Sequence, residues 1–246
     1  MNLALGISGL SVSYGERAVL DGVDLHVEAG EIAVVVGGSG CGKSTLLRAA
    51  IGLVRPSAGQ VLLFGQDLCG LPEEEQHALR RRLGIVFQQC ALFNSLTVAA
   101  NVALPLQMHT DLGEAAIGDL VAALLRQVGL QRAEALYPGE LSGGMRKRAA
   151  LARALALAPE LLLCDEPAAG LDPVAAAGID SLLLALNQTL GITIVVITQE
   201  LLSIERLDGR LAMLDEGRVV FTGSVAQARG SDLPVVQRFF HPGLRR

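Results

Sequence analysis

The chain has 246 residues, a formal net charge of −5 and a hydrophobic fraction of 51%. A chain of this length buries a large core without covalent staples, which excludes a disulfide-dependent mini-protein. The acidic balance gives no general attraction to nucleic acid or to an anionic membrane, and the aromatic fraction of 3% disfavours stacking platforms for single-stranded nucleic acid. Contact with either partner would have to be local.

No segment combines the length and the apolarity of a membrane span. The longest charge-free stretch, residues 83–110, is interrupted by polar side chains and by Pro105, and the next, residues 181–199, is interrupted by Asn187 and Gly191. A span needs about 20 consecutive apolar residues. The first residues also lack the basic segment of a secretory signal. We therefore expect the chain to stay in the cytosol.

Two alternating segments open the chain and are followed by a strand, a loop and a helix. Residues 3–12 and 18–27 alternate apolar with polar or small side chains, which predicts paired strands of an antiparallel layer. Residues 31–36 form a short β-branched run that ends in a glycine-rich loop. Residues 45–51 have helical composition. This order is typical of the start of a βαβ unit.

The middle and the end of the chain differ in pattern. Residues 161–164 and 192–197 are continuous apolar runs, as expected of parallel strands buried on both faces. Between residues 89 and 158, segments rich in alanine and leucine, such as 113–128 and 144–157, recur without a β-branched run. The sequence predicts an α/β fold in which a parallel sheet carries an antiparallel piece and a helical insertion.

The basic clusters and the cysteines are expected to have structural rather than catalytic roles. The basic clusters at residues 80–82 and 146–148 are interpreted as solvated helix faces. The cysteines have no metal-ligand spacing, and we expect reduced, small apolar residues. They are Cys41, Cys69, Cys90 and Cys164.

A glycine-rich motif follows the predicted strand at residues 31–36. Residues 37–45 match G-x-x-x-x-G-K-[ST] between a strand and a helix, as that motif requires. Backbone N–H groups of such a loop surround a β-phosphate, and the helix N-terminus adds partial positive charge. Lys43 would neutralise the β and γ oxygens of ATP, and the Ser44 hydroxyl would hold Mg²⁺. The predicted phosphate loop consists of Gly37, Gly38, Ser39, Gly40, Cys41, Gly42, Lys43, Ser44 and Thr45.

Two acidic residues follow the apolar run at residues 161–164. Asp165 and Glu166 come at the carboxyl end of this predicted strand, where ligands of parallel sheets bind. Asp165 would hold the magnesium shell, and Glu166 would orient and polarise an attacking water. The sequence Asp-Glu-Pro also suits a simple turn. Beside a phosphate loop, we favour the Walker B interpretation.

The segment Leu-Ser-Gly-Gly-Met at residues 141–145 precedes a predicted helix. Ser142 is placed as the N-cap of that helix, and a cap after a loop is the simplest interpretation. In a chain with both Walker motifs, the segment resembles the signature of the ABC-transporter ATPases. That resemblance implies that Ser142, Gly143 and Gly144 cap the γ-phosphate of ATP held by the other protomer. A homodimer would then enclose two ATP molecules.

Other positions are similar to motifs of the same family. Tyr14 looks like the aromatic residue that stacks on adenine, Gln88 like the Q-loop residue that reaches magnesium and its water, and residues 169–172 like the D-loop. The resemblance spans the chain and implies one ABC ATPase domain over residues 1–246. It implies a RecA-like core, an antiparallel β subdomain, a helical subdomain at about residues 89–158 and a C-terminal tail at about residues 225–246.

Within the family, several segments resemble the Mla/Mce-type phospholipid transporter ATPases. They are Met145 in place of the common Gln, residues 92–98 and 101–106, and the apolar tail at residues 233–240. This resemblance implies an ATPase on the cytoplasmic face of the inner membrane, bound there to integral permease subunits. An Mce-domain protein and a STAS-domain protein are further implied partners. The permease would contact the groove between Gln88 and the helical subdomain.

One position departs from the family pattern. ABC ATPases usually carry a switch histidine after the strand that ends near residue 197, and here that position is Gln199. An amide donates one N–H to a phosphate oxygen but carries no proton or charge. Loss of such a donor costs on the order of 10²–10³ in rate in other enzymes, and a retained amide recovers much of this. We expect slow ATP hydrolysis that depends on Glu166.

Three alternatives stay open. The chain could energise a transporter for another substrate, for example a polar amino acid. It could be a degenerate nucleotide-binding regulatory module with little hydrolysis, because of Gln199. It could also be an ATP-dependent clamp on nucleic acid or the ribosome, but such proteins carry two ATPase halves or a long coiled coil, and heptads are missing here. We therefore expect no nucleic-acid partner.

Overall fold

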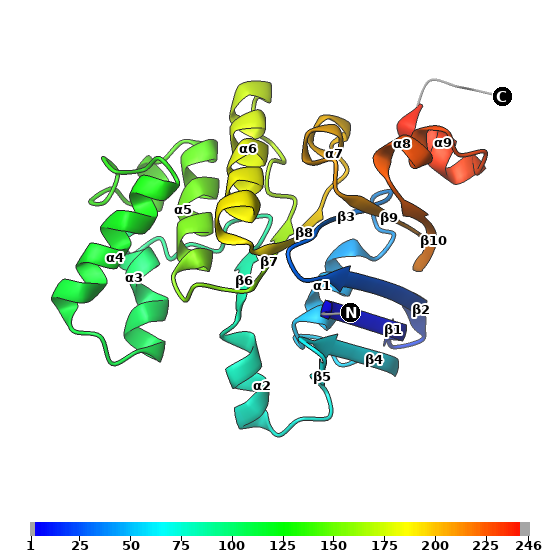
Figure 1. The fold of residues 1–246 in the computed structure, drawn as a ribbon, viewed down its shortest axis with the longest axis horizontal. Coiled ribbons are helices and arrows are strands. Elements are labelled where there is room, and N and C mark those ends of the chain that lie inside the picture. Colours follow the sequence, from blue (N-terminus) through cyan, green and yellow to red (C-terminus); the bar gives the residue numbers. More distant parts are fainter. Residues whose placement is uncertain (1–2, 242–246) are drawn as a thin grey trace.

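The computed structural model describes residues 3–241, which are organised around two sheets (Figure 1). The larger sheet has the order β10-β9-β3-β8-β7-β6, and the smaller has the order β2-β1-β4-β5. The strands are β1 (Leu3–Tyr14), β2 (Arg17–Glu28), β3 (Ile32–Val36), β4 (Ala58–Leu63), β5 (Gln66–Asp67), β6 (Leu83–Val86), β7 (Leu161–Asp165), β8 (Thr193–Ile197), β9 (Arg210–Asp215) and β10 (Arg218–Gly223).

Helices cover the sheets and extend the molecule to one side. They are α1 (Lys43–Ala50), α2 (Glu73–Arg80), α3 (Val98–His109), α4 (Glu114–Gln127), the 3-10 turn η1 (Pro138–Glu140), α5 (Gly143–Leu155), α6 (Pro173–Leu190), α7 (Leu201–Leu207), α8 (Val225–Arg229) and α9 (Pro234–Phe240). Within residues 3–241, no helix is both long and apolar enough to cross a bilayer.

The larger sheet is parallel except at one edge. Strands β6, β7, β8, β3 and β9 pair in parallel, and β10 closes the edge antiparallel to β9. Every residue of β7 and β8 is buried. Burial on both faces explains why the two strands are continuous apolar runs, and it confirms the predicted parallel strands.

The smaller sheet is antiparallel, as predicted from residues 3–12 and 18–27. β1 pairs with β2 from Leu3↔Glu28 to Tyr14↔Arg17, and β4 pairs with the other edge of β1. The apolar side chains of these strands pack with those of α1 on one face of the parallel sheet. The start of β2 lies beside the loop that follows β3, because Val19 lines a hollow together with Ser39 and Gly40.

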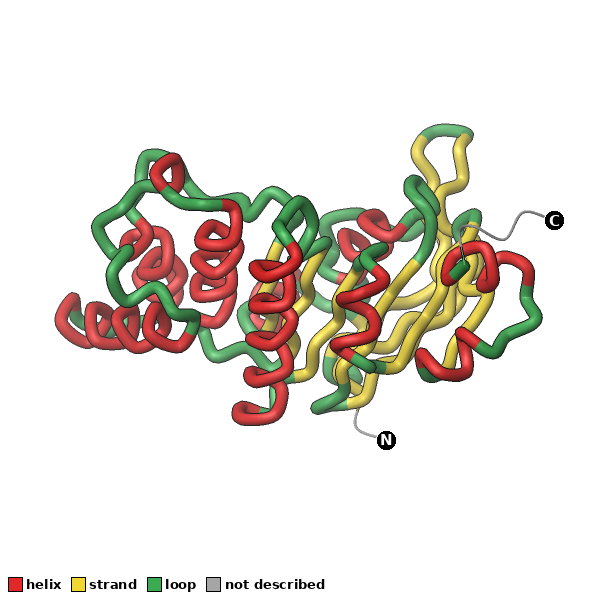
Figure 2. The backbone as a smooth tube through the Cα atoms, turned by 90° about the horizontal axis from the view of Figure 1, so that it is seen from above, coloured by secondary structure: helices red, strands yellow, loops and turns green. Residues whose placement is uncertain are grey.

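Helices α3, α4 and α5 gather away from the antiparallel sheet (Figures 1 and 2). The segments predicted at residues 113–128 and 144–157 correspond to α4 and α5. Asn101 is fully buried in α3, and its amide accepts from Phe93 N and donates to the carbonyls of Phe93, Leu96 and Thr97. One side chain thereby holds the loop that enters the helical region.

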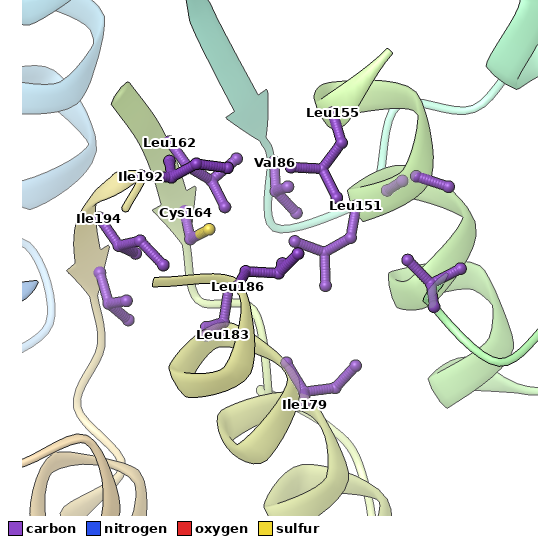
Figure 3. Packing of buried hydrophobic residues seen from close by; sticks show 14 of the residues in the cluster. Val86, Leu151, Leu155, Leu162, Cys164, Ile179, Leu183, Leu186, Ile192 and Ile194 are labelled. Carbon is purple, nitrogen blue, oxygen red and sulfur yellow. The ribbon is translucent and has the colours of Figure 1, made fainter. Parts of the chain in front are cut away.

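A second apolar cluster fills the opposite face of the parallel sheet. Figure 3 shows Leu162 and Cys164 of β7 facing Leu183 and Leu186 of α6, with Leu151 of α5 alongside. This contact joins the helical region to the sheet. All four cysteines are free, and Cys41, Cys90 and Cys164 are buried. The free state agrees with the expectation of reduced cysteines, and Cys69 is exposed after β5 rather than part of the apolar core.

Truncating a side chain at the centre of this cluster tests how much the cluster contributes to the stability of the fold. Leu162 is fully buried, and we expect Leu162→Ala to lower the free energy of unfolding by about 2–5 kcal/mol, because it leaves a cavity. Leu190→Ala is the control, since Leu190 is 54% exposed and its loss should change stability by less than about 0.5 kcal/mol. Urea denaturation followed by circular dichroism measures both, and equal losses would contradict this packing.

Candidate functional site

A pocket lies where the carboxyl ends of the parallel strands meet. The phosphate loop follows β3, Asp165 ends β7, and Gln88 and Gln199 come soon after β6 and β8. Together these segments enclose a pocket of about 250 Å³. Its lining residues are Val19, Ser39, Gly40, Gly42, Lys43, Ser44, Thr45, Gln88, Asp165, Glu166 and Gln199. Most of the residues expected at the nucleotide site from the sequence therefore share one pocket.

Two glycines of the phosphate loop are required by close contacts. A Cβ on Gly37 would lie 2.1 Å from the carbonyl oxygen of Leu214, and a Cβ on Gly42 would lie 2.7 Å from Cδ2 of Leu20. Their φ angles are +153° and +112°, which L side chains rarely adopt. The loop can therefore lie against β9 and β2 only with glycine at these positions.

The end of this loop presents positive charge to the pocket. Lys43 is the first residue of α1, and the N-terminus of α1 has no side-chain cap. Its free N–H groups suit an anion. The Lys43 ammonium donates to the carbonyls of Gly37 and Gly38, at 2.8 and 2.9 Å. These bonds hold the lysine inside its own loop, beside the place where phosphate oxygens would lie.

Asp165 fits the role of a metal ligand. Its side chain is buried, and Oδ1 has no hydrogen-bond partner within residues 3–241. An unpaired buried carboxylate oxygen is costly unless a cation satisfies it. The Ser44 hydroxyl lines the same pocket. A carboxylate and a hydroxyl are oxygen donors of the kind that Mg²⁺ takes.

Glu166 is held in an unusual backbone conformation. Its φ is +48°, a left-handed value that is uncommon for a residue with a side chain. Its N–H donates to Ile197 O at 2.8 Å, and Thr198 Oγ1 donates to Glu166 Oε2 at 3.3 Å. Burial raises the pKa of Glu166, and the nearby Lys43 and the bond from Thr198 oppose this shift. The carboxylate is thus a stronger base than an exposed one.

Four predicted nucleotide contacts lie outside this pocket. Gly38 and Cys41 line an adjoining hollow with Asp215, whereas Gly37 lines neither cavity. Tyr14 ends β1 and is 49% exposed. It is therefore accessible, but it does not belong to the wall of the pocket within one chain.

The signature segment, residues 142–144, also lies outside the pocket. Ser142 is the N-cap of α5 and accepts from Met145 N at 3.2 Å, which confirms the cap. A Cβ on Gly143 would lie 3.1 Å from Cδ2 of Leu171, so the segment packs beside residues 169–172. Within one chain these residues do not reach the phosphate loop pocket.

The interpretation of the basic clusters as solvated helix faces holds for Arg81 and Arg146, which are exposed, but it was wrong for Lys147 and Arg80. Lys147 is only 5% exposed, and its ammonium donates to Gln88 O and Glu166 O. Arg80 is half-buried and donates to Ile51 O. The helical spacing could have indicated that Lys147 is buried, because Lys147 shares a face of α5 with the buried Ala150 and Leu151.

The buried carboxylate of Glu166 predicts a stability difference. A raised pKa means that the folded protein loses stability as pH rises above the ordinary value of 4.5, and the loss is complete once pH exceeds the raised pKa of the folded state. Without nucleotide and with a chelator, Glu166→Gln should therefore unfold at a higher temperature than the wild type near neutral pH. Its advantage should shrink toward about pH 4.5. A pH-independent difference in thermal unfolding would contradict the assignment to charge burial.

Comparison with known proteins assigns the chain to a family. The family model described as ABC transporter matches residues 20–169. The chain is 40% identical over 241 residues to the probable ribonucleotide transport ATP-binding protein mkl of Mycobacterium leprae, covering 98% of this chain and 70% of that protein. It is 39% identical to the intermembrane phospholipid transport system ATP-binding protein MlaF of Haemophilus influenzae, covering 94% of this chain and 88% of MlaF.

Another relative and a solved structure agree. Identity to the methionine import ATP-binding protein MetN of Caulobacter vibrioides is 46% over 215 residues, covering 87% of this chain and 64% of MetN. The dimeric post-hydrolysis structure of the ATP-binding cassette MJ0796 bound to ADP and Pi superposes with a TM-score of 0.82 at 31% identity, covering 90% of this chain and 98% of that one. The chain belongs to the ABC transporter family, as an ATPase with a P-loop fold that binds ATP with Mg²⁺ and energises a transporter.

Proposed function

We propose that this ATPase energises the movement of phospholipid between membranes. The observation that carries the lipid assignment is the identity to MlaF over nearly the full length of both chains. The resemblance of Met145 and of the segments at residues 92–98 and 233–240 to Mla/Mce-type ATPases supports the same assignment.

The residues expected at the nucleotide site receive roles from their chemistry. Lys43 and the backbone N–H groups of residues 37–45 hold the β and γ phosphates, and Tyr14 stacks on adenine. Ser44, Gln88 and Asp165 hold Mg²⁺, which supplies neutralisation of phosphate charge when bound. Glu166 accepts a proton from the attacking water, because burial makes it a stronger base. Gln199 donates its amide to the γ-phosphate.

The signature segment acts on a second copy of the chain in this proposal. Residues 142–144 lie outside the pocket of their own chain but stand at the start of a helix, where N–H groups attract anions. A homodimer in which each signature segment covers the partner's ATP would complete both sites. The dimeric structure of the MJ0796 cassette supports this arrangement.

Rates of phosphate release test the hydrolytic roles. Glu166→Gln should slow hydrolysis by on the order of 10²–10⁴, because the general base is lost. Gln199→Ala should slow it by about tenfold or more, and Gln199→His should speed it up, because imidazole can carry charge toward the phosphate. Equal rates for the wild type and Glu166→Gln would remove Glu166 from the mechanism. An unchanged rate in Gln199→Ala would make Gln199 a structural residue.

A permease would dock beside the loop that leads from Gln88 into the helical region. Phe93 in this loop is 52% exposed. A hollow of about 590 Å³ lies between α2 and α3, where His77, Arg81 and His109 offer polar contacts around Pro105. Docking at this face would place the ATPase at the inner surface of the cytoplasmic membrane. An Mce-domain protein and a STAS-domain protein are the further partners we propose.

Methionine is a second candidate substrate, because the chain is 46% identical to the methionine import protein MetN over 215 residues, compared with 39% to MlaF over 232 residues. Purification of the tagged chain from membranes of its own cells separates the two. We expect a permease, an Mce-domain protein and phospholipid to co-purify, and ATP hydrolysis by the complex to ignore methionine. Co-purification with a periplasmic amino-acid-binding protein, together with hydrolysis stimulated by methionine, would replace the lipid assignment.

A further inference from the structure

Lys147 is a buried cation that the proposed mechanism does not use. It lies one turn into α5, and its side chain is 5% exposed. The chain has only two lysines, and the other is Lys43 of the phosphate loop. The Lys147 ammonium donates to two backbone carbonyls, Gln88 O at 2.6 Å and Glu166 O at 2.9 Å. These acceptors belong to two residues whose side chains line the nucleotide pocket.

The position is costly for a lysine. Burial lowers the pKa of Lys147, which means that its charged form is disfavoured there, and the nearby Cys90 and Glu166 oppose the shift. The rest of this face of α5 is built from alanine and leucine, including Ala150 and Leu151. An apolar side chain could fill this space without the free-energy cost of burying an ammonium group. The two hydrogen bonds are therefore the specific contribution of Lys147.

The bond to Glu166 acts at a strained peptide. Glu166 has a φ of +48°. Its N–H donates to Ile197 O, and its carbonyl accepts from the Lys147 ammonium at 2.9 Å and from Ala169 N at 3.3 Å. Backbone held from both sides keeps the carboxylate aimed at the pocket despite the strain. Loss of the lysine would remove the shorter, charged bond to this carbonyl and leave only the longer bond from Ala169 N.

Two neighbouring arginines on α5 provide a contrast. Arg153 donates to Cys90 O and Ala91 O, so it also holds the loop after Gln88 but does not reach Glu166. Arg148 donates to Val128 O inside the helical region and touches neither loop by a hydrogen bond. Lys147 alone among these three cations bonds to both the Gln88 loop and the Glu166 loop.

We propose that Lys147 is a positioning residue for hydrolysis, which ties the peptides of Gln88 and Glu166 to the helix that begins at the signature segment. The inference rests on the proposed roles of Gln88 and Glu166. It adds that the helix that caps one ATP with its N-terminus also sets the geometry of the catalytic carboxylate of its own chain. Lys147 itself does not touch nucleotide.

The test compares Lys147→Met with Arg148→Met, a matched loss of a cation from the next position of the same helix. We expect Lys147→Met to lower kcat at saturating Mg-ATP by about 10- to 100-fold, because small misplacement of reacting groups has costs of this size. Its Kd for an ATP analogue should change by less than about threefold, because the phosphate loop is intact. Arg148→Met should retain the wild-type kcat per folded molecule, with folding checked by circular dichroism.

A double variant separates positioning from general damage. If Lys147 acts through Glu166, adding Lys147→Met to Glu166→Gln should leave the residual single-turnover rate unchanged. Should Lys147→Met fail to fold, Lys147→Gln keeps an amide donor and provides the same comparisons. An equal loss of rate in both backgrounds, or the same kcat in Lys147→Met and Arg148→Met, would overturn the inference.

Different results would refute the proposed role of Glu166 and the inference about Lys147. Wild-type hydrolysis by Glu166→Gln would refute the role of Glu166 and, with it, this inference. An inactive Glu166→Gln beside a fully active, folded Lys147→Met would refute the inference alone.

Discussion

Parallel strand pairing brings opposite charges to one edge of the sheet, and the ATPase depends on this placement. β3 leads into the phosphate loop with Lys43, while β7 ends at Asp165 and continues into Glu166. In register, Asp165 pairs with Ile197 of β8, and so Glu166 stands close to Thr198 and Gln199. A cation, free N–H groups and two carboxylates thereby surround one small pocket.

Several features that lower the stability of the folded chain lie together at this edge of the sheet. The Asp165 Oδ1 atom lacks a partner within residues 3–241, Glu166 has a left-handed backbone, and Lys147 is a buried ammonium. Each of these features destabilises the folded state, so none is expected in a core that serves stability alone. Two apolar clusters on either side of the parallel sheet supply the stability that tolerates them. Such clustering of strain is expected at a functional site, where the surrounding structure holds residues in costly conformations.

Much of this was predictable because it follows from local pattern. Strands β1, β2, β3, β7 and β8 come from alternation or from continuous β-branched runs, and the phosphate loop comes from a motif with one geometry. The two-residue β5 has no such pattern, since pairing with β4 makes it a strand. The burial of Lys147 was missed because a charge run on a helix usually faces water, whereas here the ammonium bonds to two loops that are distant in sequence.

The central claim is that one chain holds the triphosphate at residues 37–45 while its twin covers it with residues 142–144. Site-directed cross-linking tests it most directly. Ser39→Cys and Ser142→Cys would be placed in separate chains that also carry Cys69→Ser, because Cys69 is the exposed natural cysteine. With Glu166→Gln to slow hydrolysis, mixed chains should cross-link through a short bis-maleimide only when Mg-ATP is present. Cross-linking that ignores ATP, or its absence in a protein that binds ATP, would contradict the claim.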